Sequence, residues 1–550
     1  MSYRTIQKLL LPEKAEQNYG LYYGGTEGVE LVEGESRSLY VPLGEKADLF
    51  TYFNGFYPGQ WKQYTTLKNF RVNISLKGSC RLILGHRNGR KTVIDRSLEC
   101  EKLTGENGTV SFEIQEWQEA AGCWVALEGR DEGAYLEDVS FEADMEETQR
   151  VRLAVVICTC RREQELLANL ERVSRMDEES RPDIFVIDNG NTLAAEQMPD
   201  FVKLIPSRNC GGAGGFTRGI LETLKDNLFT HVILMDDDIV LEPGIFEKTE
   251  RFLAILKKSW MDGALAGSLI EKEIPWKQFE CGARWNRGKI MAGRSGFDLR
   301  EKSVLLENAR KQDGEYGGWW YCCIPTRVIR EKGLPLPVFI HRDDIEYGLR
   351  IGKVMSMNGI GVWHEAVTKK LPQAGEYYDI RNMAIVNSIH YEDWNVKEWK
   401  KFLIKWFGGN ILRGRYEYVY LNIRAILDFL KGEAWLEQTD GVELHKRVAE
   451  YVPVLTRLEE KKDGIFYTTP DVSVYTAATK GHIVYEDSAG LCLEAKKNLW
   501  EALRLCVYML ITLRKTDRCF KRASDSYRRN WRKLTTEEFW NKYLEIGKDE

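Results

Sequence analysis

Apolar and polar residues alternate along much of the first 148 residues. From Phe70 to Leu76 every second side chain is apolar, a period of two that is typical of strands with one buried face. Turn dipeptides such as Asn88-Gly89 separate the alternating runs, as they do in hairpins. The pattern predicts an N-terminal β-sandwich domain over residues 1–148.

Continuous apolar runs replace this alternation after residue 148. Such runs are expected of parallel strands that are buried on both faces. A helical segment, Glu163–Val173, follows the first run, and another helical segment follows a glycine-rich turn. Alternating strands and helices predict an α/β domain with a Rossmann-like doubly wound sheet over residues 149–390. The four strand candidates are Leu153–Cys158, Asp183–Asp188, Val202–Ile205 and His231–Met235.

Helical periodicity dominates from about residue 391 onward. Trp399–Trp406 and Tyr416–Leu430 place their apolar residues on one helix face, which predicts a C-terminal helical region over residues 391–550. No run reaches the roughly 18 apolar residues that a membrane-spanning helix needs. The nearest candidate, Leu499–Leu513, is interrupted by charged residues.

Composition narrows the class of protein. The 550 residues carry a formal net charge of −5, which gives no reason to expect nucleic-acid binding. The 12 cysteines form no CxxC pair, and no ligand spacing points to zinc. The first residues lack the long apolar core of a signal peptide. We therefore expect a cytoplasmic protein, either soluble or peripheral on the inner face of the plasma membrane.

One segment combines apolar and basic residues. Residues 514–533 contain nine Lys or Arg and two Asp, a net charge of +7, and they follow the apolar run Leu499–Leu513. A basic helix beside an apolar stripe can lie on an anionic membrane, so residues 499–533 are a candidate peripheral membrane contact. The alternative is that the stripe packs inside the protein or in a homo-oligomer, with its charges in solvent.

Three aspartates, Asp236, Asp237 and Asp238, directly follow the strand candidate His231–Met235. Carboxylates crowded at a strand end repel one another unless a cation holds them. Mg²⁺ or Mn²⁺ prefers oxygen ligands and often binds substrate phosphates as well, and ligands of doubly wound sheets bind at this end of the strands. The motif predicts a divalent-metal site; the alternative is a solvated turn or a helix N-cap.

A glycine-rich segment, Asn209–Gly219, precedes the second helical segment. Glycines such as Gly211 and Gly212 allow the backbone to approach a ligand closely, and N–H groups at a helix start favour anions. Arg218 could offer a cation to phosphate. Alternatively, the segment is a tight strand-to-helix turn and Arg218 forms a surface ion pair.

Three further clusters could carry chemistry. A carboxylate of Asp343 or Asp344 near a metal site could act as general base toward a sugar hydroxyl, or the pair could cap a helix. His364 follows another strand-like run and could complete the metal site, although a lone histidine is more often structural. Trp319 and Trp320 follow two glycines and could stack on a sugar ring or pack in the core.

Taken in order, these motifs resemble those of the family-two galactofuranosyltransferases of the GT-A fold, the family of the mycobacterial enzymes that polymerise cell-wall galactan. The resemblance covers about residues 50–390, and its most specific part is the glycine-rich segment. The N-terminal β-sandwich and the C-terminal helices resemble that architecture more loosely. The matching residues are Thr159–Arg162, Asp188–Thr192, Asn209–Arg218, Asp236–Asp238, Trp319-Trp320, Asp343-Asp344 and Trp363-His364.

The resemblance implies an inverting, metal-dependent transfer of galactofuranose from UDP-galactofuranose to a glycan or lipid-linked glycan in cell-surface polysaccharide synthesis, with Mn²⁺ or Mg²⁺ as cofactor. It implies that Asp236, Asp238 and His364 bind the metal and the donor diphosphate. Asp344 would deprotonate the acceptor hydroxyl, with Asp343 beside it in contact with sugar.

The resemblance also implies where the donor and acceptor bind. Thr159, Arg162 and Asp188 would hold the uridine, and Trp319 and Trp320 would shape the acceptor site. The tryptophan run continues here as Tyr321, and the C-terminal part matches no motif of the family, so the acceptor and the number of sugars added stay open. The remaining candidate donor-binding residues are Asn209, Gly211, Gly212, Arg218 and Asp237.

Other classes of protein remain possible from the sequence. Another family-two transferase could use UDP-glucose, UDP-galactose or a dTDP-sugar, and a non-catalytic relative could bind glycans. A nucleotidyltransferase also uses aspartates with a metal, but Cys158–Arg162 lacks the basic glycine-rich signature usual there. The intact aspartates and His364 argue against a protein that has lost catalysis.

Overall fold

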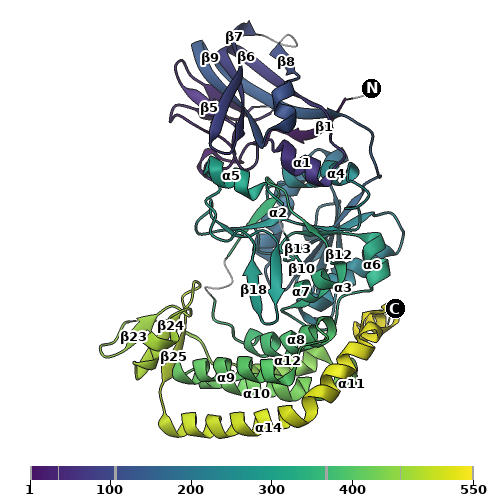
Figure 1. The fold of residues 1–550 in the computed structure, drawn as a ribbon, viewed down its shortest axis with the longest axis vertical. Helices are drawn as coiled ribbons and strands as arrows, with labels where there is room; N and C mark the ends of the chain where they lie inside the picture. Colours follow the sequence, from purple (N-terminus) through teal and green to yellow (C-terminus); the bar gives the residue numbers. More distant parts are fainter. Residues whose placement is uncertain are drawn as a thin grey trace.

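The computed structural model describes residues 3–34, 36–103, 108–311, 313–365, 370–458 and 460–547. Three parts follow one another along the longest axis of the molecule: an N-terminal β-rich part, a central α/β part and a mainly helical C-terminal part (Figure 1). Among the described helices, none has the length and apolar content needed to cross a membrane.

The N-terminal part is a nine-stranded sheet built on two long strands. β6 (Phe70–Asn88) pairs with β9 (Gly122–Asp144) along nearly its whole length, with a register shift between Gly78 and Cys80. The alternating apolar residues at the start of β6 are buried, as predicted, and Asn88-Gly89 turns the chain into β7. The other strands are β1 (Tyr3–Lys8), β2 (Gly24–Gly25), β3 (Glu30–Val32), β4 (Ser38–Val41), β5 (Lys46–Asp48), β7 (Lys91–Leu103) and β8 (Thr109–Phe112).

The central part is built on a seven-stranded sheet with the strand order β12-β11-β10-β13-β19-β14-β20. The first four are the predicted parallel strands: β10 (Leu153–Thr159), β11 (Asp183–Asp188), β12 (Val202–Pro206) and β13 (His231–Asp236). Their apolar runs are continuous because successive side chains enter two different cores, one on each face of the sheet. The added strands are β14 (Ala264–Ala266), β19 (Cys322–Pro325), which is antiparallel, and β20 (Val354–Met355).

Helices cover both faces of this sheet, as in a doubly wound fold. A smaller sheet of β15 (Ser268–Glu271), β16 (Gln278–Glu280) and β21 (Gly361–His364) lies beside it, and β17 (Ala283–Asn286) and β18 (Lys289–Ala292) form a hairpin. The helices of the first two parts are α1 (Pro58–Tyr64), α2 (Glu163–Ser174), α3 (Gly211–Leu224), α4 (Gly244–Ala254), α5 (Lys302–Asn308), α6 (Thr326–Lys332) and α7 (Asp343–Ile351).

The C-terminal part packs its helices around a third core. The predicted helices are present, but this part also contains a four-stranded sheet that the periodicity did not indicate, because its strands are short. The helices are α8 (Gly375–His390), α9 (Val396–Leu412), α10 (Tyr416–Phe429), α11 (Glu433–Gln438), α12 (Gly441–Ala449), α13 (Val474–Ala478), α14 (Leu499–Asn530) and α15 (Glu537–Tyr543); the strands are β22 (Thr456–Arg457), β23 (Phe466–Thr468), β24 (His482–Glu486) and β25 (Leu491–Lys496).

Candidate active site

Strand β13 ends on the first of the three aspartates. Its Asp236 pairs in register with Cys158 of β10, so the acidic motif leaves the sheet at its carboxyl edge. Asn169 of α2 holds the following turn, since its amide donates to the Ile239 carbonyl at 2.9 Å and its Oδ1 accepts the Leu241 N–H at 3.2 Å. The aspartates are therefore presented by a fixed turn.

A backbone bridge brings His364 to these aspartates. Val240 and Trp363 exchange two hydrogen bonds of 2.7 and 3.1 Å, which ties β21 to the segment after the acidic motif. As a result His364 Nε2 lies 3.0 Å from Asp238 Oδ1 and 3.9 Å from Asp236 Oδ2. Two residues 126 positions apart in the chain thus share one site, as the sequence led us to expect.

The donor set fits a divalent cation. Ligand atoms of Asp236, Asp238 and His364 all lie within 4.8 Å of one another. His364 Nδ1 donates to the Glu365 carbonyl at 2.6 Å, which turns Nε2 toward the carboxylates, an arrangement typical of metal-binding histidines. Burial alone would lower the pKa of His364, but its hydrogen bond to Asp238 raises it. The carboxylates around Nε2 thus favour a positive charge at this position.

Neighbouring charges only partly balance the acidic motif. Burial raises the pKa of Asp236 to about 6, against the positive charge of His364. Arg162 lies 2.6 Å from Asp238 and 3.1 Å from Asp237, which is almost fully buried. Arg162 was predicted to contact the donor, and the structure places it at the acidic motif itself.

The predicted uridine site lies at the ends of the two neighbouring strands. Thr159 ends β10 and is buried, and Asp188 ends β11. The Asp188 carboxylate accepts three backbone N–H bonds, from Gly190 at 2.9 Å, Thr192 at 2.7 Å and Leu193 at 2.9 Å. The structure therefore shows Asp188 as the residue that orders this loop, and its contact with a nucleotide stays a prediction.

The glycine-rich segment forms the first turns of α3. Asn209 Oδ1 accepts the Gly211 N–H at 3.1 Å. Gly211 has a φ of +73°, and a Cβ there would lie 2.2 Å from the Phe339 carbonyl oxygen. At Gly212 a Cβ would meet only Asp343 Oδ2, at 3.9 Å. The start of α3 therefore lies close to both Phe339 and Asp343. Only a glycine at position 211 permits the close approach to Phe339.

Farther along α3 the glycines serve packing. A Cβ on Gly215 would lie 2.2 Å from Cys158 Sγ, and one on Gly219 would lie 2.2 Å from Val156 Cγ1, so both glycines let the helix approach β10. Arg218 pairs with Glu222 on its own helix, and Glu222 also binds Lys203 and Lys225. This largely buried ion pair competes with a phosphate contact of Arg218, which stays a prediction.

Gly211→Ala is expected to destabilise the fold by about 2 kcal/mol or more, because the new Cβ would overlap the Phe339 carbonyl at a left-handed φ. Gly212→Ala is the matched control, since its Cβ has room. Thermal unfolding of both variants measures the difference. Equal unfolding temperatures for the two variants would contradict this role of Gly211.

Asp343 and Asp344 open α7 after a strained turn. Three non-glycine residues there have left-handed backbone: Phe339 at φ +75°, His341 at +65° and Arg342 at +67°. Such strain persists where surrounding structure enforces it, and it clusters at functional sites. The strained turn thus fixes the direction in which the aspartates enter the site.

Residues of α8 enforce this turn. The Asn382 amide donates to the carbonyls of Val338, Ile340 and His341 at 2.8–3.1 Å. Asp379 pairs with His341 at 2.8 Å and with Arg342 at 3.0 Å. Neither α8 residue could be identified from the sequence, because their partners lie 38 to 44 positions away in the chain.

The acidic motif and the aspartate pair both lie next to the start of α3. Cys158 is the strand partner of Asp236, and a Cβ on Gly215 of α3 would lie 2.2 Å from its Sγ. Asp343 lies beside Gly212, about one turn earlier in the same helix. The predicted metal ligands and the predicted base are therefore placed at the same end of α3.

Glu280 of β16 is a further candidate site residue, and the sequence analysis missed it. It is buried, and its Oε1 has no hydrogen-bond partner in the described chain. Burial raises the pKa of Glu280 to about 8, and the charge of Asp344 contributes. A buried carboxyl group with a free oxygen beside Asp344 suits a hydrogen bond to a polar substrate.

As the pH is lowered, activity is expected to fall at a higher pH than it would if the base were an aspartate with an ordinary pKa. Burial raises the pKa of Asp343 to about 7 and raises that of Asp344 as well. A general base works only when ionised, so protonation of the pair removes activity as the pH falls through these raised values. A pH profile of kcat measures this limb. A flat profile down to about pH 4, the ordinary aspartate value, would contradict it.

The two tryptophans have different environments. Trp319 is buried and packs edge-on against Phe216 and Tyr347, with ring centroids 5.2 and 6.3 Å apart. This is the core packing that the sequence left as the alternative. Trp320 is only partly buried and donates from Nε1 to the Gly267 carbonyl at 2.9 Å. Trp320 is therefore the better candidate for a sugar contact.

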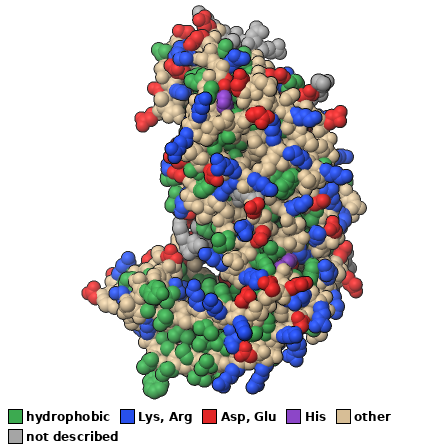
Figure 2. Space-filling view, viewed as in Figure 1, with side chains coloured by type: hydrophobic (Ala, Val, Ile, Leu, Met, Phe, Trp, Pro, Cys, Tyr) green, Lys and Arg blue, Asp and Glu red, His purple; other side chains and the backbone are tan. Residues whose placement is uncertain are grey.

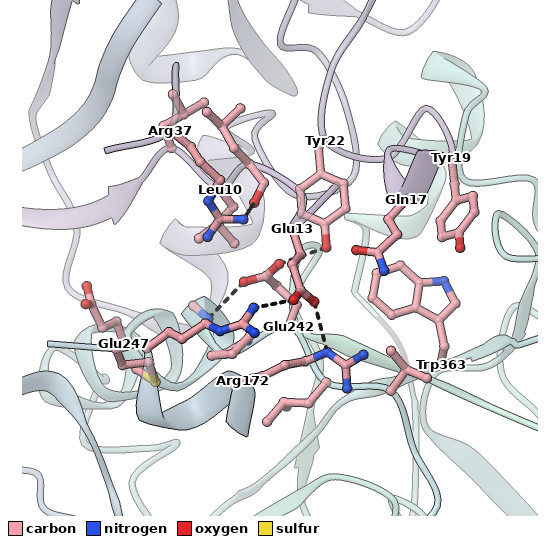
Figure 3. A pocket seen from close by; sticks show the side chains of 18 of the residues that line it. Leu10, Glu13, Gln17, Tyr19, Tyr22, Arg37, Arg172, Glu242, Glu247 and Trp363 are labelled. Carbon is pink, nitrogen blue, oxygen red and sulfur yellow. Dashed lines mark hydrogen bonds and ion pairs between the residues drawn. The ribbon is translucent and has the colours of Figure 1, made fainter. Parts of the chain in front are cut away.

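A cavity of about 440 Å³ lies at the seam between the N-terminal and central parts (Figure 3). Trp363 and Val240, the bridged pair, line it, together with Tyr19 and Tyr22. Tyr22 stacks near Trp363 and donates to Glu242 at 2.8 Å. The predicted metal ligands and the aspartate pair do not line this cavity. The residues that line the cavity instead surround the Val240–Trp363 bridge, which positions His364.

Two protein families match the chain over adjacent parts. Residues 150–363 match the family described as "Glycosyltransferase like family 2", and residues 6–144 match "Galactofuranosyltransferase 2 N-terminal". Residues 150–363 are therefore similar to family 2 glycosyltransferases, and residues 6–144 are similar to the N-terminal domain of galactofuranosyltransferases. The C-terminal residues after 363 lie outside both matches.

Two mycobacterial proteins are similar over most of the chain. The galactofuranosyltransferase GlfT2 of Mycolicibacterium smegmatis is 26% identical over 431 residues, covering 72% of this chain and 65% of that protein. GlfT2 of Mycobacterium tuberculosis is 25% identical over 435 residues, covering 72% and 67%. The chain thus spans about two thirds of the length of these relatives.

Solved structures align only weakly. The mannosyltransferase PcManGT of Pyrobaculum calidifontis, in complex with GDP-Man and Mn²⁺, aligns with a TM-score of 0.31 and 14% identity over 44% of this chain and 64% of that one. Residues 1–349 of S. aureus TarS align with a TM-score of 0.29 and 10% identity over 56% and 95%. Alignments at these scores carry no inference about the ligands of this chain.

Proposed function

Because residues 150–363 are similar to family 2 glycosyltransferases and residues 6–144 to the N-terminal domain of galactofuranosyltransferases, we propose that the chain transfers galactofuranose from UDP-galactofuranose to a hydroxyl group of a glycan. The observation that carries this proposal is the meeting of two clusters at one sheet edge. Asp236, Asp238 and His364 could hold a metal ion, and Asp343, the neighbour of Asp344, lies beside Gly212 at the start of α3, the helix that packs on β10 next to Asp236.

The proposed reaction is a single displacement that inverts the anomeric carbon. Asp236, Asp238 and His364 would hold Mn²⁺ or Mg²⁺, which when bound supplies positive charge to the diphosphate of the departing UDP. Asp344 takes the proton of the acceptor hydroxyl as its oxygen attacks the sugar carbon and the bond to UDP breaks. The strained turn before α7 holds this carboxylate in position. Because the acceptor oxygen attacks the sugar carbon directly, no covalent enzyme intermediate is needed.

The preference for galactofuranose rests on the similarity of the N-terminal part and of most of the chain to galactofuranosyltransferases. Glu280 offers an unpartnered buried oxygen near Asp344, and Trp320 is partly exposed. A polar oxygen and an aromatic ring suit a hydroxyl-rich sugar in either ring form, so these groups support a sugar donor.

Among nucleotide sugars, UDP-galactofuranose is expected to be the preferred donor. The measurement is the release of UDP or another nucleotide from a panel of UDP-galactofuranose, UDP-galactopyranose, UDP-glucose and a dTDP-sugar, each with the same glycan acceptor. A kcat/KM for UDP-glucose equal to or above that for UDP-galactofuranose would assign the chain to a different family 2 activity.

A further inference from the structure

Two cysteines of the N-terminal sheet face each other across neighbouring strands. Cys80 of β6 and Cys100 of β7 are direct partners in the antiparallel register, which runs without a shift from this pair to Leu84 and Arg96. Among the strands that the structure describes, no other register pair joins two cysteines. In Figure 1 the two strands lie at the outer end of the N-terminal part, away from the central sheet that carries the candidate active site.

The geometry of such a pair suits a disulfide. Residues directly opposite each other in an antiparallel ladder have Cα atoms about 4.5–5.5 Å apart, and disulfides span Cα separations of about 4.4–6.8 Å. Both side chains lie on the same face of the sheet, because Cys80 is buried in the core and Cys100 packs against that core. The two sulfurs can therefore be joined without a change in strand pairing.

The two thiols share a hydrogen bond. The Cys80 thiol donates it, since this bond, together with burial, raises the pKa of Cys80, whereas the same bond lowers the pKa of Cys100 to about 7. The charge of Glu99 opposes ionisation of both thiols, but Arg130 lies 3.3 Å from Glu99 and offsets its charge. Because a thiolate is the reactive form of cysteine, Cys100 is the nucleophile of the pair.

An oxidant reaches the pair from the side of Cys100. Cys80 is almost fully buried, whereas Cys100 is partly exposed on β7, which pairs with no described strand other than β6. Figure 2 shows Asp, Glu, Lys and Arg mixed over the face of the N-terminal part that it draws, at the upper end of the molecule. This face offers no patch of one charge that would select a charged oxidant. A small uncharged oxidant such as hydrogen peroxide fits this access.

We propose that Cys80 and Cys100 are a redox-sensitive thiol pair, which hydrogen peroxide converts to a disulfide between β6 and β7. The Cys100 thiolate attacks one peroxide oxygen, the O–O bond breaks, hydroxide leaves, and Cys100 becomes a sulfenic acid. The Cys80 sulfur then attacks the Cys100 sulfur, the S–O bond breaks, and the oxygen leaves as water with the Cys80 proton. Overall, two thiols lose two electrons and two protons, and one peroxide becomes two waters.

The disulfide fastens a strand that has a single neighbour. In the described chain β7 is held by β6 alone, whereas β6 also pairs with β9 along nearly its whole length. A covalent tie from β7 to β6 makes local opening of β7 rarer, because the strand can no longer separate at this point. Oxidation therefore rigidifies this edge of the sheet, and the proposal does not depend on the transfer reaction.

Peptide mapping of the full chain tests the proposal. The reduced chain would be treated with hydrogen peroxide, alkylated, and digested with trypsin without reduction. We expect the peptide of residues 78–81, which contains Cys80, to be joined to that of residues 97–102, which contains Cys100, and dithiothreitol to separate them. Hydrogen exchange of β7 should slow by about tenfold or more in the oxidised chain. The internal control is Cys123 of β9, a buried cysteine of the same sheet that faces His86, and its peptide should stay unlinked.

Two single variants separate the roles of the thiols. In Cys80→Ser, peroxide should leave Cys100 as a sulfenic acid that dimedone labels. In Cys100→Ser, the buried Cys80 should be labelled about tenfold less or weaker still, and peroxide should not change the hydrogen exchange of β7. Circular dichroism checks that each variant is folded. The proposal is overturned if peroxide leaves Cys80 and Cys100 of the folded parent chain unlinked, if they become linked only in denaturant, or if dimedone labels the two variants alike.

Discussion

Asp344→Asn is expected to lower kcat by about 100-fold or more, because asparagine has the size of aspartate but cannot accept the proton of the acceptor hydroxyl. The fold should survive, since Asp344 Oδ1 accepts the Ile345 N–H at 2.8 Å and an asparagine oxygen can do the same. Steady-state kinetics give kcat, and calorimetric titration with the donor gives its affinity, which should change little.

Asp343→Asn is the matched variant for this test. Asp343 is the first residue of α7 and lies beside Gly212 of α3, where it can contact the sugar without taking the proton. We expect Asp343→Asn to retain more turnover than Asp344→Asn. If Asp344→Asn turned over normally and Asp343→Asn were inactive, the role of base would belong to Asp343.

Removal of divalent metal is expected to abolish transfer. Dialysis against EDTA should eliminate activity, and Mn²⁺ or Mg²⁺ should restore it, because the leaving diphosphate needs a cation that the acidic motif is built to hold. Asp238→Ala should lower kcat by about 100-fold or more, since it removes the carboxylate that contacts both His364 and Arg162.

Two controls separate metal binding from folding. Asp226→Ala removes a carboxylate in the turn before β13, away from the site, and should change neither activity nor stability. Asp238→Ala should unfold within a few degrees of the parent, because Arg162 keeps its pair with Asp237. Full activity after extensive dialysis against EDTA would refute the role assigned to the acidic motif.

Much of the central part was predictable because its local chemistry is unambiguous. The continuous apolar runs at β10, β11 and β13 are the pattern expected of strands buried on both faces. Each run ends on polar residues, which the fold places at one edge of the sheet. The meeting of the acidic motif with His364 did not follow from this rule, because β21 belongs to the smaller sheet and the bridge between Val240 and Trp363 brings it to the motif.

Long-range contacts set the limits of the sequence analysis. Asp379 and Asn382 carry no motif, and their partners lie 38 to 44 positions away in the chain. Glu280 lies on the short strand β16, which carries no motif either. Arg218 has Glu222 four residues on, a helical pair that competes with any ligand. Whether a tryptophan packs in a core or faces a cleft depends on its neighbours, and this is why Trp319 and Trp320 could not be told apart.

The short strands β22–β25 escaped notice for a related reason. Each has two to six residues, which is too few for a period of two to stand out from the surrounding polar sequence. In α14 the amphipathic pattern was visible, but a sequence cannot show which of two apolar faces is covered. The structure settles this for the face at Leu505 and Phe520, which is buried.

Mass spectrometry of the acceptor tests most directly whether this chain transfers a sugar. The full chain would be incubated with a galactofuranose-containing oligosaccharide, UDP-galactofuranose and Mn²⁺, alongside Asp344→Asn. We expect acceptor species heavier by whole hexose units with the parent chain and almost none with the variant or with EDTA. An unchanged acceptor mass with every nucleotide sugar, despite measurable binding of the glycan, would show that the chain is a binding protein and not a transferase.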